Sequence, residues 1–468
     1  MTPDAFSSGD AAWMLISASL VLLMTPGLAL FYGGMAGNRH VLNMMMMSFG
    51  ALALVPVLYV LWGWSMSYAG SSFAGIVGNP FEAWGLRGQI AGPSNEYLLG
   101  SSGYPAVIDI GFQATFAIIS TAIISGAIAG RVKFSAWLTF VGIWLTFVGI
   151  WVTFAYFPLA HMVWGGGILS HAPRSLAAWL FGVSEGEALI APIDFAGGTV
   201  VHISAGAAAL VLAIVVGPRA GFPKHVDRPH NLPMVMLGAA LLWFGWFGFN
   251  GGSAFAADGL AGVAWLNTTV AAAAAMLGWM LVERIRDRAA TSLGAVSGAI
   301  AGLVAITPAA GALNPLGSIA LGFLGGIIAC LCISLKYRWG FDDSLDVVGV
   351  HLCAGLWGTI GLAFFATDNG ILTGHFTEGL KLLVVQTLIA VVAMLVSGLV
   401  TLLAALLIRA TMGWRIEDEA QGIDLGEHRE TAYDFRESVA SHRRHAHDAR
   451  ISPAPTVQPR VDTAGAKE

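Results

Sequence analysis

Residues 194–217, DFAGGTVVHISAGAAALVLAIVVG, carry no Asp, Glu, Lys or Arg after the first residue and contain one histidine, His202. Residues 198–217 alone are long enough to cross the hydrocarbon core of a bilayer, which needs about 20 apolar residues of helix. Residues 346–355, DVVGVHLCAG, repeat the pattern, because Asp346 and His351 again open an apolar run. The two segments predict two membrane helices of related design, each with a histidine inside its span.

The composition extends this prediction to the whole chain. The 468 residues are 56% hydrophobic with a mean hydropathy of +0.73 and only 11% charged, against about 25% charged in a soluble domain. An all-α polytopic membrane protein with eleven transmembrane helices is therefore predicted. The eleven apolar runs cover residues 11–32, 42–69, 106–130, 134–160, 198–217, 232–252, 260–282, 293–311, 316–335, 345–366 and 379–408.

Basic residues in the connecting segments predict the orientation, because cytoplasmic loops carry an excess of Lys and Arg. With the N-terminus outside, three basic residues fall outside: Arg87, Arg174 and Lys381. Eleven fall in the cytoplasm: Arg39, Arg131, Lys133, Arg219, Lys224, Arg228, Arg284, Arg286, Arg288, Lys336 and Arg338. We therefore expect residues 1–10 outside, a membrane domain over 11–411, and a cytoplasmic tail over 412–468 that is disordered from about Ser438.

The fourth run contains a tandem duplication. The heptad LTFVGIW occupies residues 138–144 and again residues 145–151. Seven residues make nearly two helical turns, so the duplication keeps the same helix face but adds about 10 Å of length. Residues 134–160 would span about 40 Å as a straight helix, so tilt, protrusion or a break must absorb the excess.

The two histidines are the ionisable groups most informative about function, since polar groups inside a membrane are costly. In the expected topology Asp194 lies at the outer end of the fifth helix and Asp346 at the cytoplasmic end of the tenth. This arrangement is typical of an inverted repeat, helices one to five against six to ten, with an extra C-terminal helix. A lone buried histidine is more commonly a core residue, but two at matching positions favour function. Asp342 and Asp343 are interpreted as structural residues that cap the tenth helix or pair with Lys336 and Arg338.

Aromatic residues near the outer ends of three helices form a second candidate group. They are Trp164 in HMVWGGG, Phe112 and Phe116 in GFQATFA, and Phe249 with Ser253 in GWFGFNGGSAF. Aromatic faces attract a cation, and a serine oxygen accepts its proton in a hydrogen bond. For any one of these residues an ordinary interfacial aromatic belt explains the position. Their convergence from three helices favours an external cation site.

The strings DFAGGTVVH, AHMVWGGG, GWFGFN and GVH resemble the ammonium transporter family (Amt, Mep and Rh), bacterial Amt type, over about residues 13–433. The resemblance implies a homotrimer with one narrow apolar pore per subunit. It also implies substrate recruitment at Trp164, Phe116, Phe249 and Ser253 supported by Asp194, a gate at Phe112, Phe116 and Phe249, and pore-lining positions at His202, His351 and Thr307. The loop over residues 169–192 looks expanded relative to the family.

The expected function is ammonium transport across the plasma membrane in nitrogen metabolism. Ammonium is recruited outside, loses a proton, and crosses as ammonia past the twin histidines while the imidazoles relay the proton, which makes transport electrogenic. The resemblance adds a PII signalling protein as a partner at the cytoplasmic face, and methylammonium remains a second candidate substrate. The alternatives are an electroneutral ammonia or carbon dioxide channel and an ammonium sensor. An intramembrane enzyme is disfavoured, because two histidines make a poor metal or hydrolytic site; besides the lipid bilayer, no cofactor, metal or nucleic acid is expected to bind.

Overall fold

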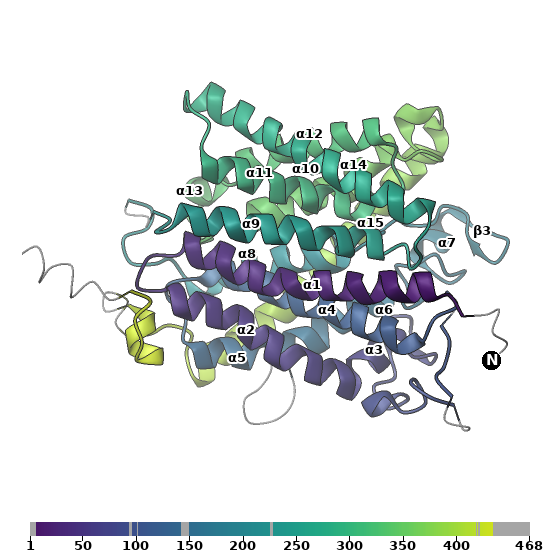
Figure 1. The fold of residues 1–468 in the computed structure, drawn as a ribbon, viewed down its shortest axis with the longest axis horizontal. Coiled ribbons are helices and arrows are strands. Elements are labelled where there is room, and N and C mark those ends of the chain that lie inside the picture. Colours follow the sequence, from purple (N-terminus) through teal and green to yellow (C-terminus); the bar gives the residue numbers. More distant parts are fainter. Residues whose placement is uncertain are drawn as a thin grey trace, which may run out of the picture.

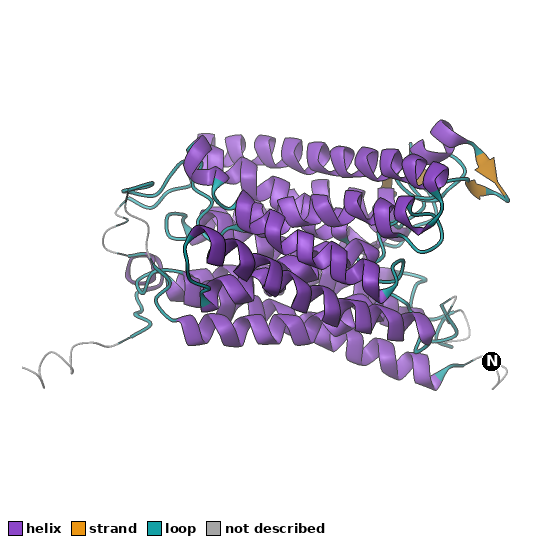
Figure 2. Ribbon diagram, turned by 90° about the horizontal axis from the view of Figure 1, so that it is seen from above, coloured by secondary structure: helices purple, strands orange, loops and turns teal. Residues whose placement is uncertain are grey.

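The computed structural model describes residues 6–92, 96–100, 102–141, 149–224, 228–417, 419 and 422–433. Its long helices lie side by side along one common direction and form a single bundle (Figures 1 and 2). In this described part, ten helical segments are long and apolar enough to cross a membrane. They are Ser8–Met35, Val41–Tyr68, Ala106–Ile128, Gly198–Val216, Leu232–Gly251, Gly259–Arg286, Ser292–Ala309, Pro315–Trp339, Val348–Phe365 and Phe376–Thr411.

Most of these spans combine an α-helix with a short π-helical or 3-10 segment. The α-helices of the spans are α1 (Ser8–Met35), α2 (Val41–Leu58), α3 (Trp64–Tyr68), α4 (Ala106–Ile124), α8 (Ser204–Val216), α9 (Leu232–Trp246), α10 (Gly259–Arg286), α11 (Ser292–Ile306), α12 (Pro315–Cys332), α13 (Leu335–Trp339), α14 (Ala354–Phe365) and α15 (Phe376–Thr411). The π-helical segments within them are η2 (Tyr59–Gly63), η6 (Gly198–Ile203), η7 (Phe247–Gly251) and η9 (Val348–Cys353), and the 3-10 segments are η4 (Ser125–Ile128) and η8 (Thr307–Ala309).

Polar side chains mark where several helices begin. Asp258, Thr291 and Asn314 each accept a hydrogen bond from a backbone amide in the first turn of α10, α11 and α12. Asn314 is followed by Pro315, whose missing N–H costs nothing at the first helical position. Such caps satisfy amides that a helix leaves unpaired at its N-terminus.

The fourth predicted span is divided. Its described parts are α5 (Phe134–Val141), then the π-helical segment η5 (Val152–Tyr156) and α6 (Phe157–Val163). Gly149 lies beside the end of α5, since a Cβ on Gly149 would come 2.5 Å from the carbonyl oxygen of Val141. The rings of Phe140 and Trp151 stack with centroids 6.5 Å apart, a contact typical of residues three or four apart in a helix.

Trp151 therefore occupies the place next to Phe140 that Trp144 would take in an uninterrupted helix. The two parts, 134–141 and 150–163, together supply about 33 Å of helix, an ordinary span length. A break thus resolves the excess length that the duplication predicts. The rest of the duplicated sequence, residues 142–148, lies outside the described residues. With this span, the predicted count of eleven is confirmed.

The ends of the bundle differ in their short elements. One end carries α7 (Leu176–Phe181), β1 (Ser72–Phe73) paired with β2 (Val77–Gly78), β3 (Val183–Ser184) paired with β4 (Glu187–Ala188), and the 3-10 segments η3 (Trp84–Leu86) and η10 (Ile371–Thr373). The β3–β4 hairpin projects from this end (Figure 2). We call it the Trp164 end and the opposite one the Arg131 end. The loop over residues 169–192 supplies α7 and the β3–β4 hairpin.

At the Arg131 end, the described part of the tail packs against the starts of two helices. The π-helical segment η11 (Asp424–His428) lies there. The Asp424 carboxylate accepts hydrogen bonds from the amides of Leu42 (3.0 Å) and Asn43 (2.8 Å), and Glu427 accepts one from the amide of Phe134 (3.1 Å). The tail therefore caps α2 and α5. Residues from Ser438 onward, for which disorder is predicted, lie outside the described residues.

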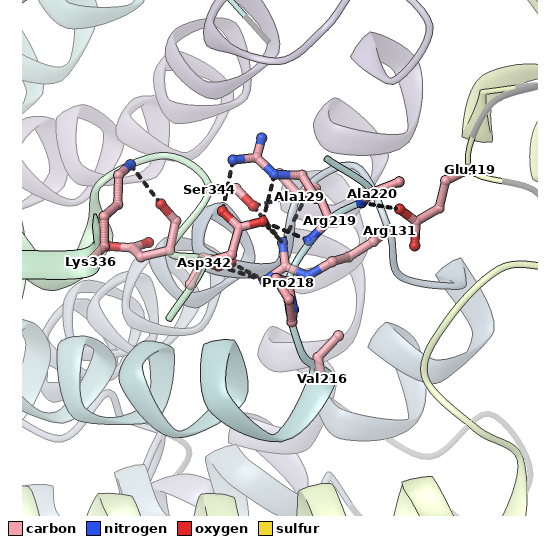
Figure 3. A network of polar contacts seen from close by, with 12 residues as sticks. Ala129, Arg131, Val216, Pro218, Arg219, Ala220, Lys336, Asp342, Ser344 and Glu419 are labelled. Atoms are coloured by element: carbon pink, nitrogen blue, oxygen red, sulfur yellow. Dashed lines mark hydrogen bonds and ion pairs between the residues drawn. The ribbon is translucent and has the colours of Figure 1, made fainter. Parts of the chain in front are cut away.

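A largely buried ionic network lies at the Arg131 end (Figure 3). The Asp342 carboxylate accepts from Arg219 Nε and Nη2, at 2.8 Å each, and lies 3.9 Å from Arg131 Nη1. The Arg131 guanidinium also donates to the carbonyls of Ala127 (3.0 Å) and Asp342 (2.6 Å). Burial lowers the pKa of Arg131 to about 10, so the side chain remains charged at neutral pH. Burial alone would raise the pKa of Asp342, but Arg219 and Arg131 hold it below its ordinary value.

Replacing Arg131 by methionine is expected to lower the free energy of unfolding by about 2 kcal/mol, because buried carbonyls lose their donors. The loss stays moderate, since Asp342 keeps Arg219. The matched control is Arg286→Met, which breaks the exposed Arg286–Asp287 pair and should cost less than about 0.5 kcal/mol. Denaturant titration in mixed micelles measures both variants. Equal losses would contradict a structural role for the buried network.

Candidate functional site

The two histidines meet inside the bundle. His202 lies in η6 and His351 in η9, both almost completely buried, and their Nδ1 atoms are 3.2 Å apart. The rings stack with centroids 5.3 Å apart. Because a neutral imidazole has one donor and one acceptor nitrogen, one Nδ1 donates to the other. His202 Nε2 has no hydrogen-bond partner among the described residues.

Close backbone packing brings the histidines together. A Cβ placed on Gly206 would come 2.5 Å from the backbone nitrogen of Leu352, so only glycine allows the two spans this approach. Both histidines also lie in π-helical segments, a geometry that occurs frequently at functional sites. The antiparallel fifth and tenth spans thus deliver one imidazole each, as the inverted repeat predicts.

An aspartate caps each histidine-bearing segment. Asp194 accepts from the amides of Gly197 (3.0 Å), Thr199 (3.0 Å) and Val200 (3.2 Å). Burial raises the pKa of Asp194 to about 6, against the lowering effect of these amides. In the other half Asp343 accepts from the amides of Val347 (3.1 Å) and Val348 (2.7 Å).

The predicted pairing of Asp194 with Asp346 is therefore wrong, and Asp343 is the true counterpart. Asp346 instead binds Lys336, with Nζ 2.6 Å from Oδ1, because its backbone lies in the left-handed region at φ 63° and directs it away from the start of η9. Burial raises the pKa of Asp343 to about 6, and the charge of Lys336 opposes this rise. Of the two aspartates predicted to cap the tenth helix or to pair with Lys336 and Arg338, Asp343 is a cap, as predicted. The prediction is wrong for Asp342, which binds Arg219 instead.

A cavity of about 310 Å³ opens at the Trp164 end. It is lined by residues from several spans and from the loop 169–192: Tyr68, Gln113, Phe116, Val163, Trp164, Leu169, His171, Pro192, Asp194, Phe195, Ser253 and Phe255. The Trp164 indole donates to the Asp194 carbonyl (2.9 Å), which fixes its ring. Ser253 donates to the Phe249 carbonyl (2.8 Å), so the Ser253 oxygen keeps acceptor capacity.

Aromatic rings connect this cavity to the histidines. The Phe116 ring meets Trp164 edge-on at 6.2 Å between centroids and packs on Phe249 at 4.2 Å. Phe249 in turn stacks on His202 at 6.0 Å. A separation of 4.2 Å leaves no space between the Phe116 and Phe249 rings, so the cavity is closed from the histidines at this point. Phe112, predicted as part of a gate, is fully buried behind Phe116 and contacts Phe255.

Beyond the aromatic pair lies a narrow apolar cavity of about 10 Å³, the lower limit for one water-sized molecule. Eight of its ten lining residues present no polar group other than an indole: Met24, Leu28, Phe31, Ile119, Ile123, Leu242, Trp246 and Ile300; the other two are His202 and His351. An ion entering it would lose its hydration without compensation. A neutral molecule with a lone pair and N–H donors meets only the two imidazoles.

Trp246 is a site residue that the sequence prediction missed. Its indole stacks on His202 at 5.5 Å between centroids, and Nε1 donates to Thr307 Oγ1 (2.9 Å). Thr307, predicted to line the pore, lies behind Trp246 and is not among the residues lining the narrow cavity. Trp246 precedes Phe249 by three residues, so helical spacing on one face was the available signal.

The chain is similar to known proteins over most of its length. A model of the Ammonium Transporter Family matches residues 12–433. The ammonium transporter of Mycobacterium tuberculosis (strain ATCC 25618 / H37Rv) is 49% identical, covering 92% of this chain and 91% of that protein, and that of Bacillus subtilis (strain 168) is 43% identical, covering 91% and 98%. Among solved structures, Saccharomyces cerevisiae Mep2 superposes with a TM-score of 0.75 at 27% identity over 93% of each chain. A structure described as a sensor Amt protein gives the same TM-score and identity over 90% of this chain and 98% of that one.

Proposed function

This chain belongs to the ammonium transporter family, and from that premise we propose that it carries ammonium by separating the ion into ammonia and a proton. The observation that supports this most is the imidazole pair, with Nδ1 atoms 3.2 Å apart, in a narrow apolar cavity behind a closed aromatic pair. A bare cation at the centre of a bilayer costs several kcal/mol. Ammonia avoids that cost.

The first step is recruitment in the 310 Å³ cavity. The faces of Trp164 and Phe116 attract a cation, and the Ser253 oxygen accepts one of its N–H groups. Asp194 contributes a negative charge whose oxygens already bind backbone amides, so it favours the cation through the field and not by direct ligation. The aromatic pair Phe116 and Phe249 must then move apart to admit the substrate.

The second step separates proton and ammonia. The apolar cavity beyond Phe249 favours the neutral amine, and His202 Nε2 is a buried nitrogen without a partner among the described residues. A proton received there can pass to His351 through the Nδ1 contact, since either nitrogen of an imidazole can donate or accept. Potassium has no proton to release and is excluded.

The remaining expectations belong to the same proposal. The Trp164 end faces outside and the Arg131 end faces the cytoplasm, which the excess of basic residues in the loops of the Arg131 end supports. The chain assembles as a homotrimer in the plasma membrane. A PII signalling protein binds the cytoplasmic face, where the described part of the tail packs against α2 and α5.

Transport is tested with purified protein reconstituted into liposomes. An ammonium concentration jump is expected to give a transient inward current, and an equal potassium jump none. Ammonia flux without current would replace this proposal with an electroneutral channel. The absence of both flux and current would favour a sensor, a role given in the description of one similar structure.

Replacing Trp164 by leucine is expected to raise the half-saturating ammonium concentration about tenfold. The indole face is worth about 0.5 to 2 kcal/mol to a cation, and about 1.4 kcal/mol corresponds to tenfold. The matched control is Trp179→Leu, because Trp179 lies 81% exposed on α7 and does not line the cavity. Peak transient currents over a series of ammonium jumps measure both variants. An equal shift in the two variants would contradict the recruitment role.

A further inference from the structure

Two polar groups in the Trp164-end cavity have no role in the proposed mechanism. They are the hydroxyl of Tyr68, the last residue of α3, and Oε1 of Gln113 in α4. Both atoms are buried, and neither has a hydrogen-bond partner among the described residues. Buried polar atoms are nearly always paired, so two unpaired acceptors in one cavity mark a place where a donor binds.

Packing holds both groups in position. Gln113 and Phe116 are three residues apart on α4 and therefore share a helix face. The Tyr68 ring packs on Trp64 with centroids 4.7 Å apart, and Trp64 Nε1 donates to Gln89 Oε1 (3.1 Å). The two acceptors are thus presented by the same cavity that contains Trp164 and Ser253.

The number of acceptors matches a particular class of donor. Ammonium has four N–H groups, and each methyl substituent removes one. Ser253 accepts one N–H group, because its own proton is donated to Phe249. Tyr68 and Gln113 bring the total to three neutral oxygen acceptors, while the indole and phenyl faces remain for the fourth N–H group or for a methyl group.

We propose that Tyr68 and Gln113 are substrate-binding residues that set the preference among ammonium ions by counting N–H donors. The proposal deepens the recruitment step and rests on the proposed function. Ammonium and methylammonium satisfy all three oxygens. Dimethylammonium and trimethylammonium leave one and two of them unpaired. The boundary of efficient binding therefore falls between methylammonium and dimethylammonium.

The test uses Tyr68→Phe and Gln113→Met, which remove an acceptor with little change in volume. Each is expected to raise the half-saturating concentration of ammonium about tenfold with the maximal current unchanged, because a hydrogen bond to a charged group is lost. For dimethylammonium, which already leaves one oxygen unpaired, the rise should be under threefold. The half-saturating concentration of dimethylammonium divided by that of ammonium, which measures selectivity, therefore falls in both variants.

A matched control is Tyr59→Phe. The Tyr59 hydroxyl is also buried without a partner among the described residues, but Tyr59 does not line the cavity. The half-saturating ammonium concentration of Tyr59→Phe should stay within twofold of the value for the unchanged protein. A shift as large as that of Tyr68→Phe would overturn the proposal, as would a lower maximal current at constant half-saturation in the cavity variants.

Thermal stabilisation of the purified protein by ammonium chloride, relative to potassium chloride, measures binding independently of transport. The order expected is ammonium and methylammonium above dimethylammonium, with the difference reduced in Tyr68→Phe and Gln113→Met. If the unchanged protein binds in this order but carries no current, the transport proposal fails and the binding proposal stands. The binding proposal fails if ammonium, methylammonium, dimethylammonium and trimethylammonium stabilise the protein equally. It also fails if both variants keep the order and the magnitude of stabilisation found in the unchanged protein, because Tyr68 and Gln113 then contact only water.

Discussion

Replacing His202 by alanine is expected to reduce the ammonium-driven current about one hundredfold. Without the imidazole, the proton has no acceptor in the narrow cavity, and a charge at the centre of a membrane costs at least about 2.5 kcal/mol. Since 1.36 kcal/mol corresponds to tenfold in rate, the loss is about two orders of magnitude. His351→Ala should show a similar loss, because the relay needs both rings of the 3.2 Å contact.

The control for this prediction is His161→Gln. His161 is equally buried, but it lies in α6 and bonds to Ser72 (2.7 Å) and the Ser67 carbonyl (3.1 Å), away from the narrow cavity. Its current per folded protein should remain unchanged. Currents are compared on equal amounts of monodisperse protein. Full ammonium current in His202→Ala, with potassium still excluded, would contradict the relay.

Replacing Asp194 by alanine is expected to lower the free energy of unfolding by about 4 kcal/mol and to abolish transport. The carboxylate accepts from three buried amides at the start of η6, and each buried donor left unpaired costs about 1 to 3 kcal/mol. The segment that holds His202 would lose its cap, so the distance between the imidazoles would no longer be fixed. Mixed-micelle denaturant titration and liposome current measure the two effects.

Asp258→Ala is the matched control for Asp194→Ala. Asp258 also caps a helix, accepting from the amide of Ala261 (2.9 Å), but it is exposed. The loss of an exposed cap costs about 1 kcal/mol, and transport should persist. If Asp194→Ala is no less stable than Asp258→Ala, Asp194 has no structural role of the kind described.

Hydropathy was sufficient to predict the spans because few backbone structures are stable inside a membrane. Each backbone polar group in the hydrocarbon must be paired within its own segment, so long apolar runs become helices. The ten spans among the described residues begin and end within four residues of the predicted runs, and the largest extensions are at the C-terminal ends of α10 and of the span Pro315–Trp339. The extensions are polar or interfacial turns that hydropathy alone does not include.

The duplicated heptad shows where this reasoning stops. A seven-residue insertion keeps the helix face in register whether it is built into the helix or removed from it, so sequence periodicity cannot distinguish the two. Packing decides, because Phe140 contacts Trp151 and Gly149 lies against Val141. An uninterrupted helix would separate both pairs.

The aspartate error has a similar cause. Asp343 and Asp346 both precede His351, and composition does not say which one turns toward the amides of η9. Asp194 precedes His202 by eight residues, and Asp343 precedes His351 by the same interval. Equal spacing was therefore the signal for the pair, while the left-handed backbone that directs Asp346 toward Lys336 is a feature of the fold.

The role of the cavity residues Tyr68 and Gln113 could not be predicted from the sequence either. Tyr68 ends one span and Gln113 lies within another, and each alone is an ordinary polar side chain near a helix end. Their significance comes from sharing one cavity with Trp164 while remaining unpaired. Single-helix patterns predict faces, whereas a binding site depends on which faces meet.

The central claim is that one ammonium ion crosses as separate ammonia and proton. The most direct test records current and luminal ammonia accumulation together in the same liposomes after an ammonium jump. One positive charge per nitrogen, with no potassium current, is the predicted result. Ammonia accumulation without charge would contradict the claim and identify an electroneutral channel.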